Sequence, residues 1–205
     1  FAGALRRLGF DTLLIWPVLE TMPDPPLASD RANLEKIAAV IDLAHEHLGM
    51  RVYLALCPNV VADDDIARRA PFAARHFFYC DLRVDPADAV AVARMMRIRG
   101  HLLGYLRAVD GVTIIDSDPG GYPGSSIAQF VSLLEAHRRL LDRLRPGIEL
   151  VYWMHAGWGS YSRYYQTGEF AWGREEEFLE TLDRLQRLAP EPWGLANGLD
   201  HARRL

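Results

Sequence analysis

Short apolar runs alternate with longer amphipathic segments along nearly the whole chain, and this alternation constrains the fold more than any other feature. Nearly continuous hydrophobic residues occupy 11–16, 51–57, 111–116 and 148–154, and 193–196 begins a fifth run. Helical periodicity marks 33–48, 85–108, 126–144 and 175–188. Apolar strands separated by helices predict a parallel sheet covered by helices. The stretch 60–85 is predicted as a long loop with one short helix.

The turns favour a barrel over an open nucleotide-binding sheet. A dinucleotide-binding sheet carries a glycine-rich turn after its first strand, whereas 16–20 reads WPVLE. The long loops follow the carboxyl ends of the strands, whereas short turns such as Pro146-Gly147 connect each helix to the next strand. This arrangement is typical of (β/α)8 TIM barrels. Four clear strands are too few to close an eight-stranded barrel. The chain also begins without Met and inside a helical pattern. We therefore expect 1–205 to be one α/β catalytic domain, an incomplete TIM-barrel-like fold truncated at both ends.

Composition restricts the partners that this chain can have. The formal net charge of -4 is too small to predict binding to nucleic acid or to a membrane surface. No apolar run reaches the ~18 residues that a membrane span needs. Cys57 and Cys80 are the only cysteines, and two isolated cysteines match neither a disulfide framework nor a zinc site. The sequence predicts no cofactor and no metal.

Acidic and aromatic residues gather near the expected carboxyl ends of the strands, where a TIM barrel places its active site. These positions hold Trp16, Glu20, Asn59, Asp116, Asp118, Tyr152, His155 and Trp158. Carboxylates protonate or attack the glycosidic centre, and indole rings cover the apolar faces of sugars. The combination predicts a carbohydrate substrate.

Asp116 and Asp118 are the predicted catalytic pair. Residues two apart in a strand point to the same side, so both carboxylates can approach one ligand. Two neighbouring carboxylates also separate their pKa values, which provides one acid and one base near neutral pH. The alternative is that Asp118 only shapes the turn, because Asp-Pro-Gly is a strong turn sequence.

The predicted substrate-binding residues also have structural alternatives. Glu20 lies four residues past its strand and can be a surface acid, and His155 can simply satisfy nearby backbone groups. The aromatic residues can belong to the core, and Tyr152 and Trp153 cannot both face inward because adjacent strand residues point to opposite sides. We expect Trp16, Trp158 and one of that pair to line the same cavity as Asp116.

Two segments resemble TIM-barrel glycoside hydrolases. The run 110–118, DGVTIIDSD, followed by Tyr122-Pro123-Gly124, looks like the acidic fourth strand of family 18 chitinases. The opening 9–17, GFDTLLIWP, is similar to early strands of family 20 β-N-acetylhexosaminidase-like barrels. The resemblance implies hydrolysis of an N-acetylhexosamine linkage with help from the substrate's own acetamido group. Carried over to this sequence, Asp116 would orient that group and Asp118 would protonate the leaving oxygen.

Two other classes of protein stay open as alternatives. A non-hydrolytic or metal-dependent barrel enzyme is one, with His155 and Asp116 as the only plausible start of a metal site. A Schiff-base aldolase is disfavoured, because Lys36, the only lysine, lies inside a helical segment. A barrel that binds carbohydrate without cleaving it is the second, since no glutamate closes the acidic series 114–118.

Overall fold

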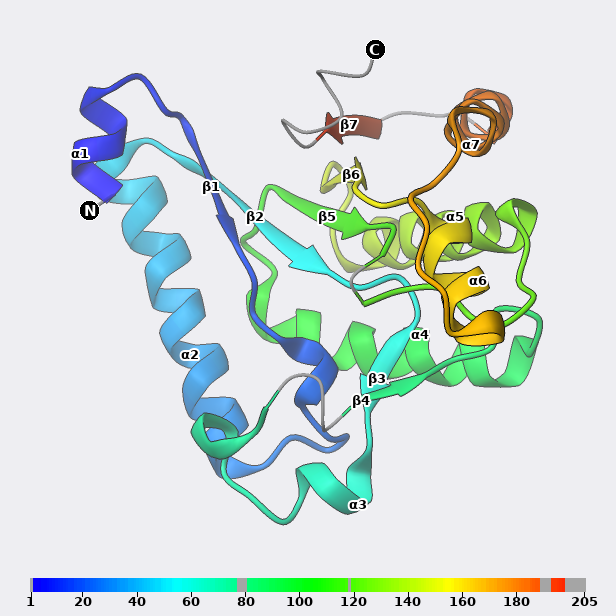
Figure 1. Ribbon diagram of the computed structural model, residues 1–205. Helices are drawn as coiled ribbons and strands as arrows, with labels where there is room; N and C mark the ends of the chain where they lie inside the picture. Colours follow the sequence, from blue (N-terminus) through cyan, green and yellow to red (C-terminus); the bar gives the residue numbers. More distant parts are fainter. Residues whose placement is uncertain (1, 77–80, 118, 189–192, 198–205) are drawn as a thin grey trace.

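A five-stranded parallel sheet forms the centre of the protein (Figure 1), with the strands in the order β1-β2-β5-β6-β7. The computed structural model describes residues 2–76, 81–117, 119–188 and 193–197. The strands of this sheet are β1 (Thr12–Ile15), β2 (Arg51–Leu56), β5 (Gly111–Ile115), β6 (Glu149–Met154) and β7 (Trp193–Asn197). All five predicted strands are therefore confirmed, and their ends differ from the prediction by single residues.

One helix precedes the first strand, and helices connect the successive strands. They are α1 (Ala2–Arg7), α2 (Ala28–Leu43) with its π-helical continuation η2 (Ala44–Leu48), α4 (Ala89–Leu103) with the 3-10 turn η5 (Gly104–Leu106), α5 (Ile127–Leu144), α6 (Trp158–Thr167) and α7 (Glu175–Leu188). The predicted helix at 85–108 is shorter, because the Asp88 carboxylate caps its start by accepting from the Val90 and Ala91 amides. α6 was not predicted.

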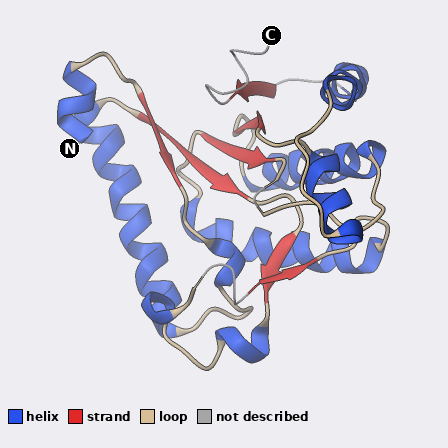
Figure 2. Cartoon of the chain, in the orientation of Figure 1, coloured by secondary structure: helices blue, strands red, loops and turns tan. Residues whose placement is uncertain are grey.

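The stretch 60–85 contains more structure than the predicted loop and short helix. It forms an antiparallel hairpin of β3 (Val60–Ala62) and β4 (Asp81–Arg83), with α3 (Asp64–Ala67) and the 3-10 turn η3 (Phe72–Ala74) between them. Figure 2 shows this hairpin apart from the main sheet. Arg75 fixes the segment, because its fully buried guanidinium bonds to the Asp30 carboxylate at 2.6 Å and to the Thr21 carbonyl at 2.9 Å.

The order of the strands distinguishes this sheet from a doubly wound one. A doubly wound sheet reverses direction at a switch point, whereas here each strand pairs with the next parallel strand along the chain. Right-handed connections that always step the same way place their helices on one face. The helices follow one another around the strands in Figure 1, and α5 packs against both α4 and α7. Within the described residues β1 and β7 remain edges, so the eight-stranded barrel and the single catalytic domain stay predictions.

The two faces of the sheet differ in burial. Side chains on the helix-facing side are almost completely buried in one apolar cluster and include Val52, Leu54, Leu56, Val112, Ile114, Leu150 and Tyr152. On the opposite side, Leu14 is 47% exposed, and Trp153 is half-buried. This second face is closed at its amino end by Tyr53, whose hydroxyl donates to Glu149 and whose ring leaves no room for a side chain at Gly111. The sheet is therefore covered by helices on one side, and its other side is buried at β2 and β5 and partly open at β1 and β6.

Candidate functional site

Three buried polar residues tie the carboxyl ends of neighbouring strands together. Glu20 joins the exit of β1 to that of β2, Asn59 joins β2 to β5, and Asp116 joins β5 to β6. Each was predicted from its position at a strand end. Each side chain is 2% exposed or less, so these groups hold the strand exits in place from within the protein.

Glu20 reaches β2 because the chain turns sharply after β1. Val18 has a φ of 54°, a left-handed conformation that is strained for a β-branched residue. The turn directs the Glu20 carboxylate inward, where Oε1 accepts from the Cys57 amide at 2.7 Å. Burial raises the pKa of Glu20, and the positive charge of Arg99 opposes that shift. The alternative that Glu20 is a surface acid is wrong.

Arg99 and His137, which sequence reasoning missed, hold the same segment from the helix side. The Arg99 guanidinium donates to the carbonyl oxygens of Cys57 at 2.5 Å and Val60 at 3.0 Å. It also contacts Nε2 of His137, whose Nδ1 donates to the Leu133 carbonyl at 2.6 Å. Burial and the charge of Arg99 keep the pKa of His137 well below its usual value, so the imidazole is neutral. Their positions on the apolar faces of α4 and α5 were the feature of the sequence from which their burial could have been predicted.

Asn59 extends this framework towards β5. Its amide nitrogen donates to the carbonyl oxygens of Val84 at 2.9 Å and Gly121 at 3.0 Å. The backbone amide of Val84 in turn donates to the backbone carbonyl of Asn59 at 2.7 Å. Asn59 therefore holds the β3–β4 hairpin and the loop after β5 against the end of β2. This role uses the side chain inside the protein, whereas the sequence suggested that it contacts substrate.

Asp116 is completely buried, and its carboxylate accepts hydrogen bonds from four groups. The donors are the Ser117 hydroxyl at 2.8 Å, the Tyr152 hydroxyl at 2.9 Å and the amides of His155 and Gly157, both at 3.2 Å. Burial raises the pKa of Asp116, and these hydrogen bonds lower it. The carboxylate therefore fixes the loop after β6 and does not face an open surface. Asp118, its predicted partner, lies outside the described residues.

The predicted aromatic residues separate into two groups. Tyr152 and Trp158 are each 1% exposed and pack in the helix-facing core. The Phe130 ring stacks on Trp158, with ring centroids 4.9 Å apart, and meets Tyr152 at 5.5 Å. The expectation that Trp158 lines a cavity is therefore wrong, because α6, which was not predicted, turns its indole into the core. Trp153 lies on the opposite side of β6 from Tyr152, as the alternation of a strand requires.

A group of aromatic side chains beyond β6 was missed by sequence reasoning. We call it the aromatic strip, and it consists of Trp153, His155, Tyr161, Tyr164, Tyr165, Phe170 and Trp172. Tyr164 is 40% exposed, and Phe170 and Trp172 are each 46% exposed. The available signal was the density of aromatic residues in 161–172, YSRYYQTGEFAW. His155, the predicted histidine, lies between the Trp153 and Trp172 rings.

The strip lies at the carboxyl edge of the sheet, beside the exit of β5. A Cβ atom at Gly121 would come within 2.9 Å of the Tyr161 side chain, so the two loops are in close contact. The Gly173 amide donates to the Ala156 carbonyl at 2.7 Å, which brings the segment after α6 back to the end of β6. Trp16, at the end of β1, is 40% exposed. Exposed rings at the carboxyl ends of parallel strands can cover the apolar faces of a sugar.

Neither a metal centre nor a membrane span is found in the described part of the chain. No group of three or more His, Cys, Asp or Glu side chains is arranged there to hold a metal ion. None of the described helices combines the length and the apolar character that crossing a bilayer requires.

Sequence comparison identifies no relative, since no protein-family model and no curated protein matches the chain. Three similar solved structures are a noncanonic maltogenic alpha-amylase, AmyB, from Thermotoga neapolitana, a GH5_18 protein from Streptomyces cattleya in complex with Manβ1-4GlcNAc, and Dispersin B. Their TM-scores are 0.46, 0.43 and 0.40, with sequence identities of 14%, 19% and 16%. They cover 95%, 74% and 60% of this chain, which spans only 52%, 38% and 36% of theirs. The likeness is a coarse one, and function has to be inferred from the site.

Proposed function

We propose that this chain forms part of a glycoside hydrolase that holds its sugar substrate at the carboxyl edge of the sheet. The observation that carries the proposal is the aromatic strip, whose rings Tyr164, Phe170 and Trp172 are exposed at the edge where parallel β/α enzymes bind their substrates. Aromatic faces bind the C–H faces of pyranose rings, and the polar atoms around them bind the hydroxyl groups. Within this site we assign sugar contacts to Trp16, His155 and Trp172.

Asp118 is the proposed general acid, which protonates the glycosidic oxygen as its bond to the anomeric carbon breaks. Support comes from the residues around it. The Ser117 hydroxyl accepts from the Ala156 amide at 3.1 Å, and a Cβ atom at Gly120 would lie 2.6 Å from the Asp116 carbonyl oxygen. Ser117 and Gly120, which flank position 118 in the sequence, are therefore in close contact with neighbouring backbone.

Asp116 takes a different part in the proposal from the one suggested by the sequence. Because its carboxylate is buried and bonded to four donors, we assign it to positioning His155 and the loop after β6. Glu20 and Asn59 position the exits of β1 and β2 in the same way. The proposed substrate class remains an oligosaccharide, with N-acetylhexosamine linkages tested first because of the family resemblance.

The test is Asp118→Asn, which keeps the shape of the side chain and removes its proton. Hydrolysis of an oligosaccharide should fall by about 10²–10⁴-fold, the usual contribution of a general acid. A nitrophenyl glycoside should be less affected, because its leaving group needs less protonation. Asp183→Asn, on the exposed face of α7, serves as the matched control and should keep the parent rates. An Asp118→Asn protein that cleaves the oligosaccharide at the parent rate would refute the assignment.

Carbohydrate binding without cleavage is the second candidate. It is favoured by one observation, the complete enclosure of the carboxylates of Glu20 and Asp116, which leaves neither free to act on a substrate. This candidate predicts that the unaltered protein binds oligosaccharides and releases no product. Product release that depends on Asp118 would decide for the hydrolase.

A further inference from the structure

The aromatic strip continues well away from the strand ends. From His155 the ring centroids are separated by 6.2 Å to Trp172, then 5.5 Å to Phe170 and 5.4 Å to Tyr161. Tyr161 leads to Tyr164 at 6.2 Å. The strip thus extends from the end of β6 along α6 and the segment after it.

The strip ends at the β3–β4 hairpin, which belongs to a different strand exit. Tyr161 lies 5.9 Å from Tyr165, and the exposed guanidinium of Arg83 on β4 lies 4.1 Å from the centre of the Tyr165 ring. Such a cation–π contact joins the loop after β6 to the loop after β2. The surface between the two exits is therefore continuous, and its far end carries a positive charge and tyrosine hydroxyls.

Building on the proposed function, we propose that the aromatic strip binds a glycan chain of several sugar units, so that the natural substrate is a polysaccharide or long oligosaccharide. Successive rings of the strip meet edge to face, so the sugars of a bound chain stack on its exposed rings, Tyr164, Phe170 and Trp172, and not on every ring. A site for a small glycoside would need only the rings next to β6. The glycan occupies the outer rings, Tyr164 and Phe170, which lie beyond that site.

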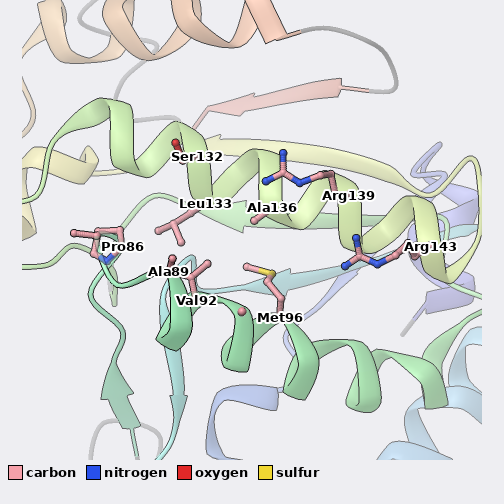
Figure 3. Close-up of a pocket in the computed structure, with 11 residues that line it drawn as sticks. Pro86, Ala89, Val92, Met96, Ser132, Leu133, Ala136, Arg139 and Arg143 are labelled. Atoms are coloured by element: carbon pink, nitrogen blue, oxygen red, sulfur yellow. The ribbon is translucent and has the colours of Figure 1, made fainter.

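The composition of the strip favours a sugar chain over another occupant. Its exposed members are aromatic, and hydroxyl or indole N–H groups accompany most of the rings. The groove between α4 and α5 provides a contrast (Figure 3). That groove has a volume of about 340 Å³ and is lined by aliphatic side chains such as Val92, Met96 and Leu133, with Arg139 and Arg143 beside them. It contains no aromatic ring and has no counterpart to the stacking surface of the strip.

Two variants test the inference, Tyr164→Ala and Phe170→Ala. Binding is measured by the retardation of the folded protein in native gels that contain a soluble polysaccharide, using glycol chitin, a β-glucan, a mannan and a xylan in turn. Each variant should bind the polysaccharide that retards the parent protein about 2- to 12-fold more weakly, which is the equivalent of one aromatic stacking contact.

Matched variants separate sugar binding from packing. Tyr105 is 37% exposed, similar to Tyr164, but lies just before β5 at the amino edge of the sheet, so Tyr105→Ala should leave binding unchanged. Tyr164→Phe keeps the ring and should retain the parent affinity, whereas loss of fold in Tyr164→Ala would show as a lowered melting temperature. The fold of each variant is checked in this way before its affinity is compared.

The outcomes distinguish this inference from the proposed function. If the parent protein binds a polysaccharide, the two alanine variants weaken that binding and no glycoside is cleaved, the strip is a glycan-binding surface and the hydrolase proposal fails. If glycosides are cleaved but polysaccharide affinity is the same in the parent and in folded alanine variants, the inference about the strip is overturned. It is also overturned if the parent protein binds none of the four polysaccharides.

Discussion

Replacing Asp116 with alanine should destabilise the protein, because the carboxylate is the acceptor for two backbone amides and two hydroxyl groups inside the protein. It is fully buried and takes hydrogen bonds from the amides of His155 and Gly157 and from the hydroxyl of Tyr152. The Ser117 hydroxyl also donates to it, but this group can rotate towards another acceptor. Asp116→Ala thus leaves the two amides without a partner, whereas the Tyr152 hydroxyl keeps its hydrogen bond with the Thr181 side chain.

The expected loss follows from the cost of each unpaired donor. A buried donor without an acceptor costs about 1–3 kcal/mol, so two of them cost about 2–6 kcal/mol. Part of this is offset, because the raised pKa of Asp116 means that burial disfavours its charge. We therefore expect a decrease of about 2–4 kcal/mol in the free energy of unfolding. That decrease is a large fraction of the ~5–15 kcal/mol that stabilises a typical protein.

Urea denaturation followed by circular dichroism measures this loss directly. The melting temperature should also fall, by about 4–16 °C at 2–4 °C per kcal/mol for a domain of this size. Asp183→Ala is the control, because Asp183 is 56% exposed and pairs only with Arg187 on the next turn of α7. Its removal should cost less than about 0.5 kcal/mol. A loss below about 1 kcal/mol for Asp116→Ala would show that the hydrogen bonds around the carboxylate do not hold the loop after β6.

Two further predictions concern Glu20 and Trp158. Burial raises the pKa of Glu20 above its ordinary value of 4.5, so the folded state binds the proton of this carboxyl more tightly than the unfolded state does. The contribution of Glu20 to stability therefore falls as pH rises from 4.5 through the raised pKa. Glu20→Gln removes that contribution, so urea unfolding from pH 4.5 upward should give a smaller fall in stability with pH than in the parent; an equal fall would contradict the shift. Trp158→Ala should lower the free energy of unfolding by about 3–5 kcal/mol, because it leaves a cavity against Phe130; a folded variant of parent stability that binds sugar less well would return Trp158 to the binding site.

The sequence by itself determined the order of strands and helices. The central strands β2 and β5 bury both of their faces, and this burial requires a continuous apolar run in the sequence. Glycine and proline end the helices between the runs, as at Gly49 and Pro146. These signals are local, so they place β2 and β5 within a residue of where the structure has them. They also locate the strand exits, and with them Glu20, Asn59 and Asp116.

Only the tertiary structure decided what those residues face. Both sides of β5 are apolar, so the alternation of its side chains predicts that Asp116 lies on the same side as Val112 and Ile114. The alternation does not predict that this side faces the helices. Its donors come from a loop 39–41 residues away, whose approach depends on the packing of β6 against β5. In the same way, α6 carries Trp158 into the core and brings Tyr164 to the surface. Which side chains meet depends on how distant segments pack, and a single sequence contains no local pattern for that.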